Sequence, residues 1–260
     1  IIDNKKIQSV QAHNIAEALN FQCGVRVETD CQTCNYTQLR INGLSGGYSQ
    51  ILINGKSIFS PLTGLYGMEQ IPSNMIDRIE IVRGGGSSLY GSSAIGGVVN
   101  LITKLPKYNN FDFGYTFRSI NHNVNDKVIF GNGTIISKNG NSGATFYVNS
   151  RERDFYDHNG DNFSELPNLN DNTFGANFFF KPTDNQKIEL NFGSLHEYRY
   201  GGEMISGAPH LSMQSEERIH DVLIGNIDYS IDFLSGKYSL LTYLAAQKTD
   251  REHYTGIRPD

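Results

Sequence analysis

The stretch that decides the fold is Phe111-Asp112-Phe113-Gly114-Tyr115-Thr116-Phe117-Arg118. Aromatic side chains alternate there with small or polar ones, and this period of two predicts a β-strand with one apolar and one polar face. The alternation recurs in the runs 144–149, 173–181, 187–192 and 226–233. With further runs near 127–137 and 238–249, we expect about seven strands.

Short and long connections alternate between these strands. Residues 138–142, 181–186 and 234–237 have the composition of tight turns, whereas residues 154–171 and 199–217 are long and polar. Outer-membrane barrels have this arrangement, with short periplasmic turns and long extracellular loops. The strands also reach the roughly 9–11 residues that a tilted strand needs to cross a bilayer. A soluble sandwich is the alternative, although its strands usually have about five or six residues.

The composition excludes several other classes of protein. Hydrophobic residues make up 38% of the 260 residues, and no window approaches the roughly 18 apolar residues of a membrane-spanning helix. The 14 Tyr and 15 Phe are too many for a disordered chain. A net charge of −5 argues against a nucleic-acid-binding protein. A barrel with a wet lumen and polar loops accounts for the low hydrophobic fraction.

The first hundred residues have shorter and more mixed patterns. We expect a helix at 12–20, strands at 37–42 and 50–54 that pair as a hairpin closed at 43–49, a helical turn running into a strand at 75–82, and a strand at 95–103. The predicted architecture is therefore a mixed α/β domain at residues 1–105 and part of an antiparallel transmembrane barrel at residues 106–260.

Two of the three cysteines form a C-x-x-C pair, Cys31 and Cys34. A zinc site needs a second pair of ligands at matching spacing, and a thioredoxin-like motif begins a helix, whereas this pair precedes a strand-like run. We favour a structural disulfide between Cys31 and Cys34 in an oxidising compartment. Cys23 is then free, or paired outside this segment.

Two glycine-rich stretches imitate catalytic motifs. Residues 84–97 lack the spacing of a phosphate-binding loop, and no helix pattern follows them. Residues 43–47 match G-x-S-x-G, but they lead into a strand, whereas a nucleophile elbow leads into a helix. No paired carboxylates or nucleophile–base set emerges elsewhere. We therefore expect neither an enzyme nor a cofactor.

Two further groups are candidate ligand sites. Asp157, Asn159 and Asp161 alternate like calcium ligands, but the position of Gly160 does not fit an EF-hand, so we favour a solvated loop and keep calcium as the alternative. His196, His210 and His220 are expected to be exposed histidines in or beside a loop, with haem or metal capture as the alternative.

The ordered series of motifs in the first part of the chain carries a resemblance. It comprises Ile53-Asn54-Gly55-Lys56, Gln70-Ile71-Pro72, Ile76-Asp77-Arg78-Ile79-Glu80-Ile81-Val82-Arg83-Gly84, Ser87-Ser88-Leu89-Tyr90-Gly91 and Ala94-Ile95-Gly96-Gly97-Val98-Val99-Asn100. Over residues 12–104 the series resembles the plug domain of TonB-dependent outer-membrane receptors. Residues 106–260 are then the first seven or so strands of a barrel that has 22 in plugged transporters.

The chain departs from the family pattern at three places. The family's N-terminal TonB box is missing, Asn42-Gly43 stands where an Arg-Gly pair is usual, and Cys23-Gly24 stands where Pro-Gly is frequent. The chain also begins without a signal peptide and ends directly after an aromatic-rich stretch. We therefore expect it to be a segment of a longer protein.

The resemblance implies an active importer in the outer membrane of a Gram-negative bacterium. Its cargo would be a scarce, bulky nutrient such as an iron–siderophore complex, haem or cobalamin, and its energy would come from TonB and the proton-driven motor of the inner membrane. Its surroundings would be outer-membrane lipid, and nucleic acid is not an expected partner. The alternatives are a surface adhesin or binding β protein that does not transport, and an importer of peptide or glycan that works with a surface lipoprotein.

The resemblance and the expected hairpin together suggest site residues. The hairpin places residues 30–36 and 56–67 at one end of the domain, which faces outwards in the family. The expected ligand contacts are Gln32, Tyr36, Phe59, Leu65, Tyr66 and Met68. The expected polar contacts between plug and barrel are Arg78, Glu80 and Arg83, with Glu189 as the barrel partner of Arg83.

Overall fold

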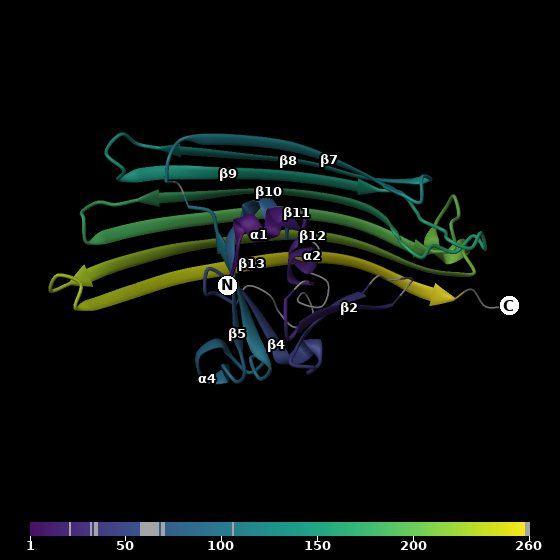
Figure 1. Cartoon of the computed structure of the whole chain (residues 1–260), viewed down its shortest axis with the longest axis horizontal. Helices are drawn as coiled ribbons and strands as arrows, with labels where there is room; N and C mark the ends of the chain where they lie inside the picture. Colours follow the sequence, from purple (N-terminus) through teal and green to yellow (C-terminus); the bar gives the residue numbers. More distant parts are fainter. Residues whose placement is uncertain are drawn as a thin grey trace.

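The computed structural model describes residues 1–20, 22–31, 33, 36–57, 68, 71–105 and 107–257, with Asp30 and Tyr36 described by their backbone alone. A curved sheet of long strands carries a smaller α/β unit on its concave side (Figure 1). We call the smaller unit, from β1 to β6, the plug, and the long-stranded sheet the wall. The plug elements are β1 (Ile2–Asp3), α1 (Asn4–Ser9), α2 (Ile15–Leu19), β2 (Val25–Cys31), β3 (Tyr36–Ile41), η1 (Gly46–Tyr48), β4 (Ser49–Ile53), η2 (Ser73–Met75), β5 (Ile76–Arg83), α4 (Ser87–Tyr90) and β6 (Gly97–Thr103).

The helix α2 begins at a cap that the sequence supplies. Asn14 Oδ1 accepts a hydrogen bond from the backbone N–H of Glu17 at 2.9 Å, and the Glu17 carboxylate accepts one from the backbone N–H of His13 at 3.0 Å. These contacts satisfy N–H groups that the first turn leaves without partners. The expected helix at 12–20 is therefore confirmed, with shorter bounds. None of the described helices has both the length and the apolar character needed to cross a membrane.

The plug sheet has the strand order β1-β5-β6-β4, with β4 parallel to β6. The expected hairpin of residues 37–42 with 50–54 is wrong, because β3 pairs with β2 instead. In β4, Gln50 to Ile53 are all buried, so both faces of this strand are covered, as is usual for parallel strands under helices or other layers. Because β3 and β4 do not pair, no hairpin places residues 30–36 and 56–67 at the same end of the plug.

The tight turn after β4 fixes the direction of the next residue, Lys56. Asn54 and Gly55 have φ values of 51° and 78°, a left-handed pair that Asn-Gly adopts readily in two-residue turns. The Asn54 side chain donates to Thr103 Oγ1 at 2.9 Å and accepts from the Thr103 N–H at 3.0 Å. The Gly55 N–H donates to Asn100 Oδ1 at 2.8 Å. The turn is thus tied to β6.

The wall has seven antiparallel strands in sequence order, which confirms the expected number. They are β7 (Asn110–Ile120), β8 (Val124–Ile136), β9 (Ser142–Arg153), β10 (Asn168–Phe180), β11 (Gln186–Gly202), β12 (Gln214–Phe233) and β13 (Tyr238–Ile257), with a 3-10 turn η3 at Pro209–Leu211. Three tight connections lie at one end of the strands, and the two long connections and the tight turn between β7 and β8 lie at the other (Figure 1). The described strands form an open sheet, with β7 and β13 at its edges.

The two long connections are shorter than expected. The first spans residues 154–167, because β10 already begins at Asn168, and the second spans residues 203–213, because β11 has 17 residues and β12 has 20. Their charged ends look like loop sequence, but residues 196–202 pair with residues 215–221 in the strand ladder. In these strand ends polar residues occupy both faces of the sheet. A prediction based on alternating apolar residues therefore ends each strand too early.

The wall has an apolar outer face and a polar concave face. Its exposed large side chains include Phe111, Phe113, Tyr115, Phe117, Ile129, Phe146, Val148, Phe174, Phe178, Leu190, Phe192, Leu223, Ile227 and Leu244. Alternate positions on the same strands carry buried polar residues, among them Asp126, Arg151, Asn177 and Asp228. An exposed apolar belt around a polar interior is typical of a barrel in lipid.

Candidate functional site: the plug–wall interface

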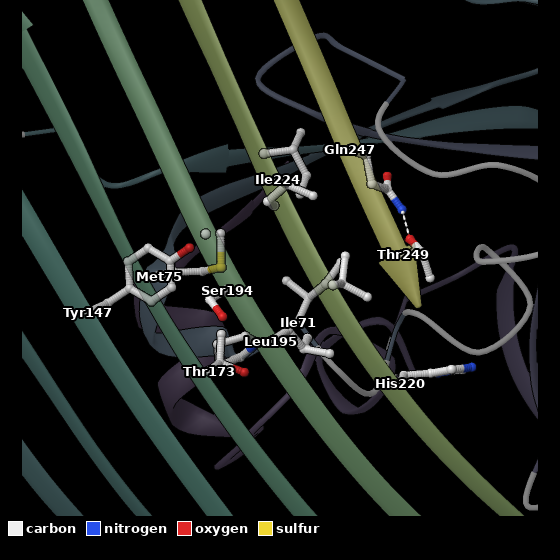
Figure 2. A pocket seen from close by; sticks show the side chains of 14 residues that line it. Ile71, Met75, Tyr147, Thr173, Ser194, Leu195, His220, Ile224, Gln247 and Thr249 are labelled. Carbon is white, nitrogen blue, oxygen red and sulfur yellow. Dashed lines mark hydrogen bonds between the residues drawn. The ribbon is translucent and has the colours of Figure 1, made fainter. Parts of the chain in front are cut away.

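The hydrophobic core of the plug includes one residue of the wall. Tyr147 of β9 is 4% exposed and belongs to the same buried cluster as Ile53, Ile71 and Met75. A cavity of about 50 Å³ lies at this contact, between the plug and strands β9 to β13 (Figure 2). Ligand sites usually have roughly 300–1,000 Å³. The contact is therefore a packing interface and not a site for a bulky nutrient.

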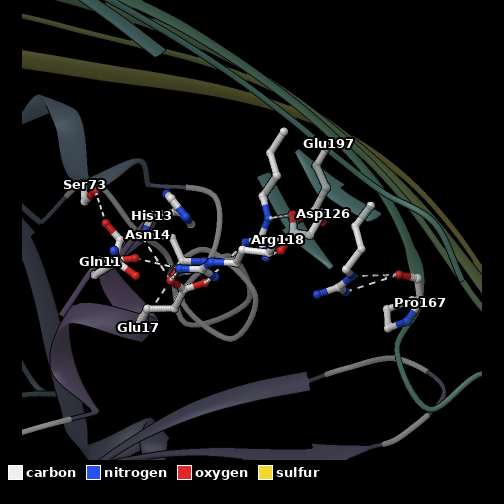
Figure 3. Close-up of polar contacts among 12 residues, drawn as sticks. Gln11, His13, Asn14, Glu17, Ser73, Arg118, Asp126, Pro167 and Glu197 are labelled. Atoms are coloured by element: carbon white, nitrogen blue, oxygen red, sulfur yellow. Dashed lines mark hydrogen bonds and ion pairs between the residues drawn. The ribbon is translucent and has the colours of Figure 1, made fainter. Parts of the chain in front are cut away.

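The carboxylate of Glu17 in α2 meets two arginines of the wall. Arg118 of β7 donates to both Glu17 oxygens at 3.3 and 3.2 Å, and to the backbone oxygen of Gln11 at 2.6 Å (Figure 3). Arg151 of β9 lies 3.7 Å from Glu17 and donates twice to Asp126 of β8, at 2.9 and 2.8 Å. Glu17 thus joins the start of α2 to three wall strands.

The side chain of His13 lies beside this group of charges (Figure 3). Its Nε2 is buried and has no hydrogen-bond partner among the described residues. Burial lowers the pKa of His13 below its ordinary value, and the positive charge of Arg118 lowers it further. The docked plug therefore favours the neutral imidazole.

A second polar contact ties the Asn54–Gly55 turn to the other side of the wall. The Lys56 ammonium forms an ion pair with Asp228 of β12, and both side chains are buried. Lys56 also lies 5.6 Å from the ring centroid of Tyr243 on β13, within the range of a cation–π interaction. The plug is thus held at two separated places along the wall.

A third group of charges lies within the wall, on its concave face. Glu197 accepts hydrogen bonds from Arg199 and Arg218, each at 3.1 Å, and lies 3.7 Å from His220. All four residues are less than 5% exposed. Buried charges of this kind need full pairing to be tolerated. The group gives strands β11 and β12 a rigid polar surface near the long connections.

The three candidate histidines do not form one site. His220 is buried on β12, whereas His196 on β11 is exposed and forms a 2.7 Å contact with Asp221, and His210 lies in η3. The expectation of loop histidines is therefore wrong for His196 and His220, which lie on extended strands. Among the described residues no group of three or more His, Cys, Asp or Glu is arranged to hold a metal ion.

The loop that contains Asp157, Asn159 and Asp161 is stabilised by hydrogen bonds between its own side chains and backbone. The Asp157 carboxylate accepts hydrogen bonds from the backbone N–H groups of Gly160 at 2.6 Å and Asn162 at 2.9 Å. These bonds stabilise the charged form and lower the pKa of Asp157 against the opposing effect of desolvation. Asp161 accepts in the same way from Phe163 at 2.8 Å. The loop carboxylates therefore serve as acceptors for their own backbone.

Most of the expected ligand contacts fall outside the described residues. Gln32, Phe59, Leu65 and Tyr66 lie there, and Tyr36 is described only by its backbone at the start of β3. Met68 is described and is 1% exposed in the plug core. Cys31 is disulfide-bonded and Cys23 is a free, exposed thiol. Cys34 lies outside the described residues, so its pairing with Cys31 stays a prediction.

The backbone near the predicted ligand segment lies against the wall. A Cβ built on Gly201, at the end of β11, would lie 2.1 Å from the carbonyl oxygen of Thr33. Gly201 adjoins the long connection 203–213, so the backbone of Thr33 lies at the long-loop end of the wall. A side chain at residue 201 would collide with the Thr33 carbonyl.

The expected plug–barrel residues have other partners. Arg78 forms ion pairs with Glu80 at 2.8 Å and Asp77 at 3.2 Å, within its own strand. Arg83 donates to the backbone oxygen of Cys23, and Glu189 pairs with Lys187 at 2.7 Å. The described structure therefore does not bring Arg83 and Glu189 together.

The residues that do join plug and wall were not among the expected contacts. Those joined by ion pairs are Glu17, Lys56, Arg118, Arg151 and Asp228, and Asn74 also donates to the backbone oxygen of Val148 at 3.1 Å. Asp228 had a sequence signal, because it lies on the polar side of an alternating strand and such residues face the lumen. Nothing local to Lys56 or Glu17 indicates which strand each one meets.

Comparisons with known proteins agree with this architecture. The family model "TonB-dependent Receptor Plug Domain" matches residues 1–98. Vitamin B12 transporter BtuB of Photobacterium profundum is 38% identical over 103 residues, which cover 40% of this chain and 17% of that protein. The iron-regulated outer membrane virulence protein of Vibrio cholerae is 37% identical over 111 residues, with the same coverage. The chain thus spans about a sixth of the length of these relatives.

Solved structures extend the similarity of fold to almost the whole chain. The siderophore receptor PiuA from Acinetobacter baumannii matches 97% of this chain with a TM-score of 0.73 and 15% identity, and 36% of that receptor is covered. The ferric enterobactin receptor PfeA from Pseudomonas aeruginosa, a mutant form, matches 96% with a TM-score of 0.65 and 14% identity, and 44% of it is covered.

Three observations agree: the match of the plug family model, the mixed plug sheet on the concave face of the wall, and the apolar outer face of that wall. TonB-dependent receptors are proteins of the Gram-negative outer membrane, where such a face meets lipid. Residues 1–98 match the TonB-dependent receptor plug domain, and the seven strands that follow have the fold of part of an outer-membrane receptor barrel.

Proposed function

We propose that the chain is part of an active transporter that imports a scarce, bulky nutrient across the outer membrane. The observation that supports this proposal is a plug with its own sheet that packs against the lumen face of the wall and is held there by polar contacts, among them those of Glu17 and Lys56. A large barrel leaves a lumen that its own side chains cannot fill. A plug held in this way can close the lumen at rest and open a path when those contacts separate.

The names of the relatives support the proposed cargo class. The curated relatives named above include a vitamin B12 transporter, and the solved structures include siderophore receptors. Cobalamin and ferric siderophores share one chemical description, a bulky metal complex that is scarce outside the cell. We propose a ligand of this class, an iron–siderophore complex, haem or cobalamin, that arrives from the long-loop end of the wall.

The energy source in this proposal is TonB with the proton-driven motor of the inner membrane. The plug would respond to ligand on the outer side and to TonB on the periplasmic side. The lipid partner of the outer wall face is the outer membrane. A surface lipoprotein would be a further partner if the cargo were peptide or glycan.

An uptake experiment tests the proposal. The full-length protein would be produced in a Gram-negative host that lacks its own cobalamin, haem and siderophore importers, and uptake of each labelled compound would be measured with and without TonB. We expect saturable uptake of one class that disappears without TonB. Uptake that persists without TonB, or no binding of any of these compounds by a folded outer-membrane barrel, would overturn the proposal and favour an adhesin.

A further inference from the structure

A row of residues across the concave face of the wall forms a continuous apolar strip beneath the plug. Gly175 of β10 lies opposite Tyr147 of β9 and Gly193 of β11, and Gly193 lies opposite Ile224 of β12. Lumen faces of barrels are usually polar and wet. Here the strip carries two glycines flanked by an aromatic and an aliphatic side chain, and both side chains contact the plug core.

The ring of Tyr147 lies flat across Gly175. A Cβ built on Gly175 would lie 2.1 Å from Cζ and Oη of Tyr147, far inside contact distance. A Cβ on Gly193 would lie 3.4 Å from the same Oη and 3.0 Å from Ile224. The two glycines therefore form a shallow trough, and Tyr147 fills it from one side while Ile224 closes it from the other.

The plug rests on this filled trough. Ile53, Ile71 and Met75 belong to the same buried cluster as Tyr147, and they line the small cavity together with Gly193 and Ile224 (Figure 2). The ion-paired contacts of the plug lie on either side of the strip, with Arg118 and Arg151 on β7 and β9 and Asp228 on β12, while Asn74 donates to the backbone oxygen of Val148, beside Tyr147, at 3.1 Å. The strip is thus the apolar centre of an interface with charged edges, the usual anatomy of a docking surface.

We propose that Tyr147, Gly175, Gly193 and Ile224 form the seat on which the plug docks, and that Tyr147 is its positioning residue. Gly175 is required because a methyl group there forces the ring off the wall. A ring displaced towards Ile53 and Met75 meets the small cavity of about 50 Å³ and then the plug core, so the plug has to shift to make room for it. This proposal rests on the proposed transport function. It adds that the seat determines how tightly the plug closes the lumen at rest.

The wall contains a matched control for this geometry. A Cβ on Gly114 of β7 would lie 2.2 Å from the ring of Phe130 on β8, so a second aromatic lies flat over a second glycine. Phe130 is not part of the plug core cluster. Gly114→Ala therefore produces the same local crowding without a plug contact.

The test measures leakage through the resting full-length protein in outer membranes, as susceptibility of the host to vancomycin, which is too large to cross an intact outer membrane. Heat-modifiable migration confirms that each barrel is folded. We expect Gly175→Ala to raise susceptibility about tenfold, and Gly114→Ala and Tyr147→Phe to match the wild type. In a Tyr147→Ala background, Gly175→Ala should add nothing, because the ring that it displaces is gone.

Equal susceptibility of Gly175→Ala and Gly114→Ala would overturn the seat, as would an undiminished effect of Gly175→Ala in the Tyr147→Ala background. If Gly175→Ala does not fold, the comparison of Tyr147→Gln with Tyr147→Phe replaces it. We expect leakage through the Tyr147→Gln protein, which lacks the ring, and none through the Tyr147→Phe protein, which keeps it. Equal leakage through both would contradict the seat. Leakage requires neither substrate nor TonB. A negative uptake experiment and a negative leakage experiment therefore contradict different proposals, the transport function and the docking seat.

Discussion

Lys56 of the plug and Asp228 of β12 form an ion pair across the interface, although they are 172 residues apart in sequence. Their side chains are only 6% and 11% exposed. Removing two charges from water costs free energy, and their mutual attraction offsets this cost only while they are together. The pair is therefore favourable in the docked plug, and separating it requires that both charges regain water.

Breaking one half of this pair should loosen the plug strongly. Lys56→Met leaves Asp228 buried without its partner, which typically costs about 3–5 kcal/mol. We expect faster hydrogen exchange of the plug amides and increased entry of large antibiotics. Replacing both residues, as Lys56→Met with Asp228→Leu, should cost much less, because no unpaired charge remains. A double variant as damaging as the single one would contradict this account of the pair.

The contact of Glu17 with the wall should contribute less. Arg118 and Glu17 are 34% and 28% exposed, so solvent screens their attraction and the expected loss for Glu17→Gln is about 1 kcal/mol or less. Hydrogen exchange of α2 should report the change. The matched control is Glu80→Gln, whose contacts are with Arg78 and Asn100 inside the plug. If Glu80→Gln releases the plug more than Glu17→Gln, the assignment of the wall contact is wrong.

Arg83 and Glu189 should behave independently. Arg83 donates to the Cys23 carbonyl and Glu189 pairs with Lys187, so neither depends on the other. In a double-mutant cycle of Arg83→Ala and Glu189→Ala, measured as the change in the free energy of plug release, we expect a coupling of less than about 0.5 kcal/mol. A larger coupling would show that the two residues meet when the plug is docked.

Docking of the plug should weaken in mild acid through His13. Burial and Arg118 lower the pKa of His13 in the docked plug, whereas an undocked plug has the ordinary value of about 6.5. Above that pH both states are neutral and docking does not depend on this group. As the pH falls below it, the undocked state binds the proton first, so docking loses free energy until the lowered pKa is reached.

The charged groups that face His13 are Arg118, Arg151, Glu17 and Asp126. Hydrogen exchange of α2 at pH 7.5 and 5.5 should show more opening at the lower pH in the wild type than in His13→Gln, which cannot take up the proton. The same pH dependence in both proteins would assign the effect to the carboxylates instead.

The segment after Lys56 should carry ligand recognition. Deleting residues 59–67 is expected to abolish ligand binding, because the aromatic side chains expected to contact the ligand are removed. Heat-modifiable migration should show that the barrel still folds. Unchanged affinity of the deletion variant in an equilibrium binding assay would remove residues 59–67 from the site.

The sequence by itself determined the two architectures of this chain. Period-two alternation from Phe111 onwards specifies which residues of each strand share a face, because side chains of an extended chain point to opposite sides in turn. The ordered motifs around Arg78 to Gly84 and Ala94 to Asn100 specify the plug. These patterns lie within short stretches of sequence. The fold class can therefore be predicted from them without knowing which distant residues are in contact.

Only the tertiary structure decided which distant residues meet. β4 pairs with β6 and not with β3, because its Gln50–Ile53 run is covered on both faces once the plug is assembled. Glu17 meets Arg118 and Lys56 meets Asp228 because the plug docks in one orientation on a curved wall. Such pairings join residues from 48 to 172 positions apart and depend on register and packing, and no local pattern of charge or hydrophobicity encodes them.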